Sequence, residues 1–185
     1  MHGAARVIYT VGHSTRSQEE LAAVLQAGGV EEVVDVRSVP HSRRHPQFDS
    51  RALARWLPEQ GIAYTHEGAL GGFRRPKRGS PNRGWEQEGF QGYADYMRSE
   101  EFSAALSGLQ KRARGRVVCV MCAEAQWWRC HRRLIADALV VAGWRVLHLG
   151  LGGEPAPHEL TSFAVLGADG RLTYPPPQAE LDLGA

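Results

Sequence analysis

A strand, a polar loop and a helix follow one another in residues 117–141, VVCVMCAEAQWWRCHRRLIADALVV. The first five residues, VVCVM, give the strongest strand signal of the chain and predict a buried strand. Apolar residues recur at helical spacing from position 130 to 141 and predict a helix whose inner face carries Leu134, Ile135, Ala138 and Leu139. A strand followed by a helix in this way is the repeating unit of parallel α/β sheets.

The same alternation runs along the rest of the chain. Further strands are predicted at residues 6–11, 32–36, 62–66 and 145–149. Helices are predicted after the capping box Ser17-Gln-Glu-Glu20, after Asp49 or Ser50, and at about 93–97 and 100–112. Because right-handed crossovers place such helices on both faces of a sheet, the sequence predicts an α/β fold. We expect a single three-layer, Rossmann-like domain with a mostly parallel sheet of about five strands flanked by helices.

One domain accounts for all 185 residues, since 20.4 kDa leaves no room for two independent cores. The hydrophobic content of 43% and the charged content of 23% exclude wholesale disorder. Within residues 1–185 we expect a core over about 6–150, a long basic loop insertion at 68–89, and an irregular tail at 151–185. The tail holds at most a hairpin, at the turn Ala168-Asp169-Gly170.

Three features predict a reduced, cytoplasmic protein that does not associate with a membrane. No apolar run approaches the roughly 18 residues that a membrane span needs. The first residues, Met-His-Gly-Ala-Ala-Arg, do not have the pattern of a signal peptide. Three cysteines, an odd number, argue against a disulfide framework.

Charge is unevenly distributed along the chain. Ten Arg and Lys residues face three acids between Arg37 and Arg83, whereas residues 149–185 hold five acids and one arginine. Solvated loops explain such an excess, and so does a basic rim that collects an anionic ligand. The net charge of +2 does not by itself indicate nucleic-acid binding.

Polar residues follow each predicted strand, at the edge where parallel α/β sheets bind ligands. The segments are Gly12-His13-Ser14, Asp35-Val36-Arg37, Leu70-Gly71-Gly72, the pair Cys122-Ala123-Glu124 and Cys130-His131-Arg132, and His148. The helix after residue 129 also presents its N-terminal N–H groups at this edge, and such groups favour anions. A thiol facing that end beside arginines is expected to have a lowered pKa, which predicts a reactive Cys122.

We therefore predict one site at this edge of the sheet. The predicted catalytic residues are Cys122 as nucleophile or polar anchor, Glu124 and His13 as acid or base, and Asp35. The predicted substrate-binding residues are Ser14, Arg37, Arg43, Gly71, Gly72, Cys130, His131 and Arg132. This interpretation assigns no metal ligand and no cofactor.

Structural roles stay open for several of these residues. Asp35 and Arg37 lie two apart on a strand, so they share a face and can form a structural ion pair. His13 can satisfy a backbone carbonyl. The pair Trp127-Trp128 fits either packing or a lid over a planar ligand. The ion pair, the histidine contact and the packing of the tryptophans need no ligand.

Metal binding and redox pairing are alternatives for the cysteines. Cys119-Val-Met-Cys122 has the spacing of a zinc knuckle, but it lies in a predicted strand where a turn is required, and we expect Cys119 in the core. Cys122, Cys130 and His131 can instead form a two-sulfur, one-nitrogen site with an open position. Cys122 and Cys130 can also form a redox pair.

A set of motifs resembles, in order and spacing across about residues 7–150, the bacterial and archaeal family called domain of unknown function 488. These motifs are Gly12-His13-Ser14, Asp35-Val36-Arg37 with Pro40, Leu70-Gly71-Gly72, and Cys122-Ala123-Glu124 followed by Cys130-His131-Arg132. The resemblance implies an α/β domain whose motif residues gather in one pocket, and it implies no reaction. Residues 74–88 and the tail after Gly150 are expected to be variable, so the basic loop is not implied as a family feature.

Three functions are consistent with these residues. The leading hypothesis is an enzyme that acts on an anionic, phosphate-bearing substrate, such as a nucleotide or a nucleic-acid end, by hydrolysis or group transfer. The second is a non-catalytic nucleic-acid-binding module, with loops 41–45 and 74–83 on phosphates and Trp85 or Trp127 stacking on a base. The third is a thiol redox or metal-binding protein. The expected partner is an anionic small molecule or a nucleic acid, and not a membrane.

Overall fold

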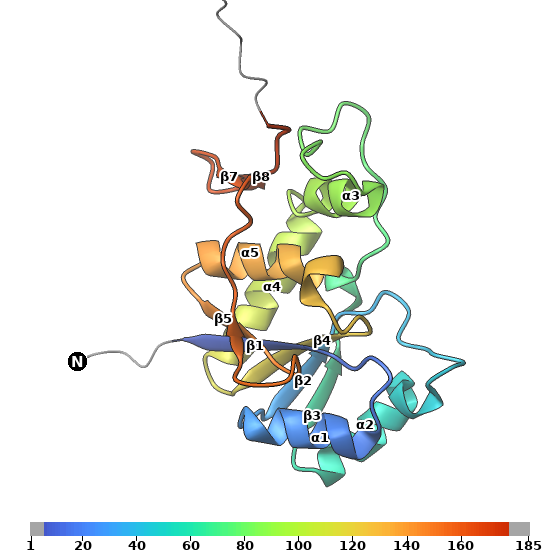
Figure 1. Cartoon of the computed structure of the whole chain (residues 1–185). Helices are drawn as coiled ribbons and strands as arrows, with labels where there is room; N and C mark the ends of the chain where they lie inside the picture. The colour runs from blue at the N-terminus through green and yellow to red at the C-terminus, as the bar shows by residue number, and fades with distance from the viewer. Residues whose placement is uncertain (1–5, 178–185) are drawn as a thin grey trace, which may run out of the picture.

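The computed structural model describes residues 6–177, and its centre is a six-stranded sheet (Figure 1). The strands are β1 (Val7–Gly12), β2 (Glu32–Asp35), β3 (Ala63–His66), β4 (Val118–Cys122), β5 (Arg145–His148) and β6 (Ala156–Pro157). Their order across the sheet is β3-β2-β4-β1-β5-β6. Strands β1 to β5 pair in parallel, and β6 pairs antiparallel with β5. The predicted mostly parallel α/β sheet is confirmed.

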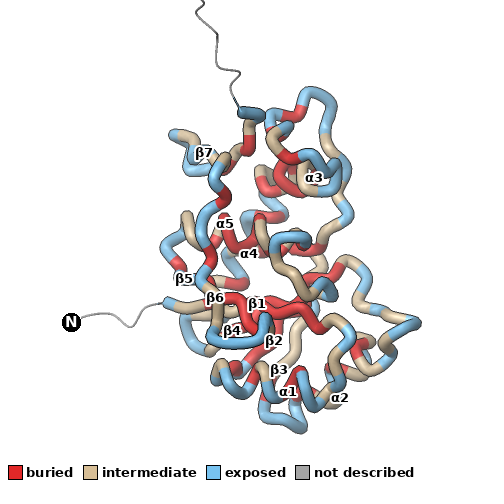
Figure 2. The backbone as a smooth tube through the Cα atoms, in the orientation of Figure 1, coloured by how far each residue is buried: buried red, intermediate tan, exposed pale blue. Residues whose placement is uncertain are grey.

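Helices cover both faces of the sheet and complete three layers (Figure 1). They are α1 (Gln18–Ala27), α2 (Ser50–Glu59), α3 (Glu88–Tyr96), α4 (Glu100–Ala113) and α5 (Arg132–Val141). Helices α1 and α2 contribute residues such as Leu21 and Leu53 to one apolar cluster. Helices α3, α4 and α5 contribute residues such as Tyr93, Leu109 and Leu134 to the other. Figure 2 shows the buried strands running between these layers.

Side chains of β4 alternate between the two clusters. Val118 and Val120 lie in the cluster with α5, while Cys119 and Met121 lie in the cluster with α1 and α2. Side chains that alternate between two buried faces of the sheet are typical of a central parallel strand. Cys119 is therefore a core residue, as predicted, and Cys122 turns toward the α5 side at the strand's end.

Local sequence signals place most helix ends correctly. The predicted capping box is confirmed, because Ser17 Oγ accepts from the N–H of Glu20 and the Glu20 carboxylate accepts from the N–H of Ser17. Asp49 caps α2. Helix α3 starts earlier than predicted, since Gly89 and Gly92 weaken its helical signal. Strand β6 was not predicted because it has only two residues, one of them a proline at the sheet edge.

One buried carboxylate organises the basic loop insertion. Asp95 of α3 accepts hydrogen bonds from the backbone N–H of Lys77, the hydroxyl of Ser80 and the side-chain amide of Asn82, each at 2.7 Å. Arg75 and Lys77 themselves stay exposed. The loop is thus fixed at its centre, while the side chains of Arg75 and Lys77 face solvent.

The tail forms the predicted hairpin, whose strands are β7 (Val165–Leu166) and β8 (Leu172–Thr173). A buried chain of hydrogen bonds joins the tail to the sheet. His158 Nε2 donates to Asp137 Oδ1 at 2.8 Å, and Tyr174 donates its hydroxyl to Asp137 Oδ2 at 2.8 Å. His148 Nε2 lies 3.0 Å from His158 Nδ1, and His148 Nδ1 lies 2.6 Å from Thr10 Oγ1.

The Asp137 carboxylate only accepts hydrogen bonds, so His158 donates to Asp137, His148 donates to His158, and Thr10 donates its hydroxyl to His148. The arrangement holds His148 neutral and couples the segment after β5 to α5. Among the described helices, none is long and apolar enough to cross a membrane.

The buried His148 predicts a loss of stability on acidification. Burial, with the charges of His158 and Arg132, lowers the pKa of His148 from 6.5 to about 3. The unfolded chain therefore takes up a proton below about pH 6.5, and the folded chain does not until about pH 3. The stability from this group is complete above pH 6.5 and falls with pH by about 1.4 kcal/mol per unit.

Urea titrations between about pH 7 and pH 5 measure this slope. His148→Gln is expected to make this slope shallower by that amount, because glutamine does not titrate. Identical slopes in the wild type and His148→Gln would contradict the assignment.

Candidate functional site

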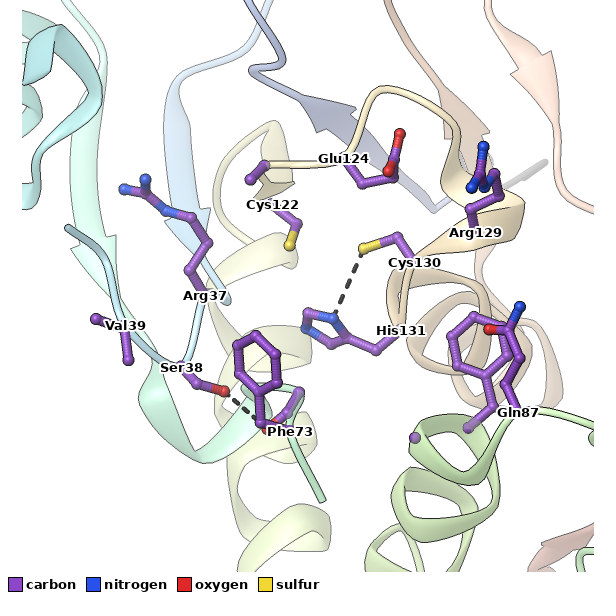
Figure 3. Close-up of a pocket in the computed structure, with 14 residues that line it drawn as sticks. Arg37, Ser38, Val39, Phe73, Gln87, Cys122, Glu124, Arg129, Cys130 and His131 are labelled. Carbon is purple, nitrogen blue, oxygen red and sulfur yellow. Dashed lines mark hydrogen bonds between the residues drawn. The ribbon is translucent and has the colours of Figure 1, made fainter. Parts of the chain in front are cut away.

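A pocket of about 420 Å³ opens at the carboxyl edge of the sheet, where β2 and β4 end (Figure 3). Cys122, Cys130 and His131 meet in it. Its other walls carry Glu124 and Arg129 from the loop after β4, Arg37, Ser38 and Val39 from the segment after β2, and Gly72, Phe73 and Phe90. Residues from separate segments thus share one cavity, as the sheet-edge argument predicts.

Two thiols and an imidazole converge in this pocket. The Sγ atoms of Cys122 and Cys130 and a ring nitrogen of His131 all lie within 4.8 Å of one another. Cys130 Sγ is 3.6 Å from His131 Nδ1, and His131 Nε2 is 3.0 Å from the carbonyl oxygen of Val36. Since a carbonyl only accepts, Nε2 carries the proton and Nδ1 of the neutral ring is an acceptor facing the thiols.

The more acidic thiol is Cys130 and not Cys122. The hydrogen bond from Cys122 lowers the pKa of Cys130 well below its ordinary value, against burial, which raises it. The same hydrogen bond and burial raise the pKa of Cys122 well above its ordinary value. The predicted lowered pKa of Cys122 is therefore wrong. Of two neighbouring buried thiols, one keeps its proton and donates it to the other.

Asp35, predicted to be catalytic, lies behind the pocket in a buried ion pair. Arg37 Nε and Nη2 donate to its two oxygens at 2.9 and 2.7 Å, and the Tyr64 hydroxyl donates to Oδ2 at 2.7 Å. Burial alone lowers the pKa of Arg37, but the hydrogen bond and charge of Asp35 raise it above its ordinary value. Asp35 has no exposed surface, so the structure supports the alternative of a structural ion pair.

Arg37 also fixes His13. Its Nη1 lies 3.2 Å from His13 Nε2, while His13 Nδ1 lies 3.0 Å from the carbonyl oxygen of Ser14. His13 therefore donates through Nδ1 and accepts through Nε2. Burial, opposed by the Ser14 hydrogen bond and reinforced by Arg37, lowers the pKa of His13 to about 4. His13 is neutral near pH 7, and both of its ring nitrogens are engaged.

Arg132, predicted to bind substrate, is only 1% exposed and does not line the pocket. Its Nη1 donates to Thr10 Oγ1 at 3.2 Å, and its Nη2 donates to the carbonyl oxygen of Glu124. Gly12 packs against the same loop, because a Cβ there would lie 1.8 Å from that carbonyl oxygen. Arg132 and Gly12 thus shape one wall of the pocket from behind.

The two predicted glycines after β3 permit close packing. A Cβ at Gly71 would lie 2.6 Å from Ser38 Oγ, and one at Gly72 would lie 3.1 Å from His131 Nδ1. Ser38 donates its hydroxyl to the Gly72 carbonyl at 2.8 Å. Gly72 lines the pocket and Gly71 does not.

A second hollow of about 430 Å³ adjoins the pocket and shares Arg37, Val39, Ala123 and Glu124 with it. It is lined by the predicted residues His13 and Ser14 and by His41, Ser42 and His45. The predicted Arg43 is exposed and lines neither hollow. A ligand longer than the first pocket can extend between these hydroxyl and imidazole groups.

The pocket residues that the sequence did not indicate include Arg129, Phe73 and Phe90. Arg129 is exposed and forms no ion pair within residues 6–177. Phe73 is 92% exposed with a φ of 57°, a left-handed conformation that bulky residues rarely adopt. Phe90 of α3 also lines the pocket. Arg129 directly precedes Cys130, and Phe73 directly follows Gly72. The sequence feature that could have indicated these two pocket residues is their position beside a motif.

The two tryptophans considered for base stacking pack within the protein. Trp85 is 5% exposed among the rings of Phe90, Phe163 and Tyr174. Trp127 stacks on His148, with ring centroids 4.2 Å apart. Trp85 is therefore unavailable to a base, and one face of Trp127 is already covered.

Fold and site together define an α/β domain with a cysteine–histidine pocket at the carboxyl edge of its sheet. The chain belongs to the family described as domain of unknown function DUF488, whose pattern matches residues 17–139. The resemblance drawn from the motifs is thus confirmed, and the match includes both cysteine motifs. No curated protein and no solved structure matches the chain.

Gly12→Ala tests the contact between β1 and the loop after β4. The added methyl would overlap the Glu124 carbonyl, so we expect a loss of about 2–3 kcal/mol in the free energy of unfolding. Gly108→Ala, on an open part of α4 with no atom within 4 Å, is expected to gain about 0.5–1 kcal/mol. Denaturant titration compares the two, and a Gly12→Ala variant as stable as the wild type would rule out the contact.

Proposed function

We propose that the chain is an enzyme that binds an anionic, phosphate-bearing substrate in this pocket and hydrolyses it or transfers a group from it. One observation carries the proposal: Cys122, Cys130 and His131 share a single cavity with Glu124 and Arg129. Packing alone does not require two thiols, an imidazole, a carboxylate and a guanidinium to surround a space that can admit a ligand. Such convergence is typical of reaction centres.

The cationic group for an anionic substrate is Arg129. Its guanidinium is exposed at the pocket and has no ion-pair partner in the described chain, whereas Arg37 is already neutralised by Asp35. A guanidinium presents planar donors that match phosphate and carboxylate oxygens. The adjoining hollow, with its hydroxyl and imidazole groups, gives room for the rest of a nucleotide-sized molecule.

Glu124 is the acid–base group that the geometry leaves free. One carboxylate oxygen accepts from the N–H of Gln126 at 3.2 Å, and the side chain is exposed at both hollows. In hydrolysis it takes the proton of the attacking water, and the leaving group departs with a proton returned from it. In group transfer a second substrate's hydroxyl replaces water in the same step. Cys130, Cys122 and His131 hold the reacting end.

Anion binding is tested with Arg129→Ala. A charge-assisted hydrogen bond contributes about 1.5–3 kcal/mol, so its removal is expected to weaken binding at least about ten-fold. Isothermal titration calorimetry with inorganic phosphate and ribonucleoside monophosphates measures the change. Arg55→Ala, at an exposed arginine of α2, makes the same change of charge away from the pocket and should bind as the wild type does. Equal affinities in Arg129→Ala and wild type would remove the anion assignment.

Catalysis is tested with Cys130→Ala and Glu124→Gln on a panel of phosphomonoesters, phosphodiesters and nucleotides. Both variants are expected to keep the wild-type circular dichroism and to lose turnover of whichever compound the wild type converts. Cys119→Ala, at a thiol on the opposite face of the sheet, is expected to retain turnover. Full activity in both pocket variants would show that the reaction centre is misassigned.

A further inference from the structure

We infer that Cys122, Cys130 and His131 form a zinc site with one coordination position open to the pocket. Within residues 6–177 they are the one group of three or more His, Cys, Asp or Glu residues whose ligand atoms converge. The role of the metal in turnover rests on the function proposed above, whereas the metal site itself does not.

The spacing of the three ligand atoms fits a tetrahedral ion. Zinc–sulfur bonds of about 2.3 Å and zinc–nitrogen bonds of about 2.0–2.1 Å place neighbouring ligand atoms roughly 3.5–3.8 Å apart. Cys130 Sγ and His131 Nδ1 already lie 3.6 Å apart, and all three atoms lie within 4.8 Å of one another. Two sulfurs and one imidazole nitrogen favour zinc over magnesium or calcium, which prefer oxygen.

The imidazole is prepared for coordination by its surroundings. His131 Nε2 donates to the Val36 carbonyl, which leaves the Nδ1 lone pair on the side of the two sulfurs. A backbone acceptor on the second ring nitrogen is the usual support of a metal-bound histidine, because it sets both tautomer and orientation. The Tyr93 ring, 5.1 Å from the imidazole, and the close approach of Gly72 restrict the ring further.

The three ligands come from well-fixed parts of the fold. Cys122 ends β4, in register with Gly12 of β1, and Cys130 and His131 immediately precede α5. Figure 3 shows both sulfurs and the imidazole turned toward one another at the pocket. Three protein ligands beside an accessible cavity are the arrangement of catalytic zinc sites, whereas structural sites use four.

An ion held this way supplies a bound water whose pKa falls to about 7. Glu124, which lines the pocket without belonging to the converging ligand atoms, takes the proton of that water. The oxygen then adds to the electrophilic phosphorus or carbon of the substrate, the bond to the leaving group breaks, and the proton passes from Glu124 to that group. Both cysteines are ligands in this scheme, and neither forms a bond to the substrate.

The test is the zinc content of the full chain, expressed in zinc-supplemented medium, dialysed against metal-free buffer and measured by inductively coupled plasma mass spectrometry. We expect about one zinc ion per chain in the wild type and in Cys119→Ala. Cys122→Ala, Cys130→Ala and His131→Asn are expected to lose it. On the unmodified chain, two thiols should react with a thiol reagent only after treatment with a chelator, a readout that does not depend on the folding of any variant.

Glu124→Gln separates the metal site from the proposed function, because it should keep its zinc and lose turnover. A folded, reduced wild type that neither holds nor takes up zinc overturns the metal site, even where the turnover experiments still support the enzyme. Zinc retained in Cys130→Ala and His131→Asn places the ion elsewhere and also overturns it. If the ligand variants lose zinc as expected but turnover does not change when zinc is removed, the zinc site is supported and the role of zinc in the reaction is overturned.

Discussion

The buried guanidinium of Arg132 joins the two central strands to the helix that follows them. It donates to Thr10 of β1 and to the carbonyl of Glu124 just after β4, and it starts α5 itself. A buried charge is costly unless polar groups surround it; here the same Thr10 continues the hydrogen-bonded chain to His148 and the tail. One cation therefore sets where the loop after β4 runs and where α5 begins, and these two segments carry Glu124, Cys122, Cys130 and His131.

Polar residues at the sheet edge divide into two layers with different tasks. Behind the pocket, Asp35, Arg37 and His13 contact one another, and Arg132 donates to Thr10 and to the Glu124 carbonyl. Little of the surface of these four residues is open to a ligand. In the pocket, the two thiols, the imidazole, Glu124 and Arg129 have atoms that face the cavity. The inner layer holds the strand ends and loops in place, so the polar groups of the outer layer converge on one cavity.

The fold was predictable because its signals are local. The apolar run of β4, the capping box at Ser17 and the cap at Asp49 each act within a few residues, and all three were predicted. The rule for parallel sheets then indicated the correct edge, and Cys122, Glu124, Cys130 and His131 do meet there. What the sequence could not give depends on distant contacts. Arg132 turns inward because of Thr10, far away in the chain. The unequal sharing of a proton between Cys122 and Cys130 arises between two thiols that only the fold brings together.

The inferred zinc centre brings two sulfurs and one imidazole nitrogen together at one ion. X-ray absorption at the zinc edge of the purified full-length protein tests it most directly, since it reports the atoms bound to the ion. We predict two sulfur neighbours at about 2.3 Å and two nitrogen or oxygen neighbours at about 2.0–2.1 Å, the second of these a water or substrate atom. A shell with only nitrogen and oxygen neighbours, or a protein with no bound zinc to measure, would contradict it.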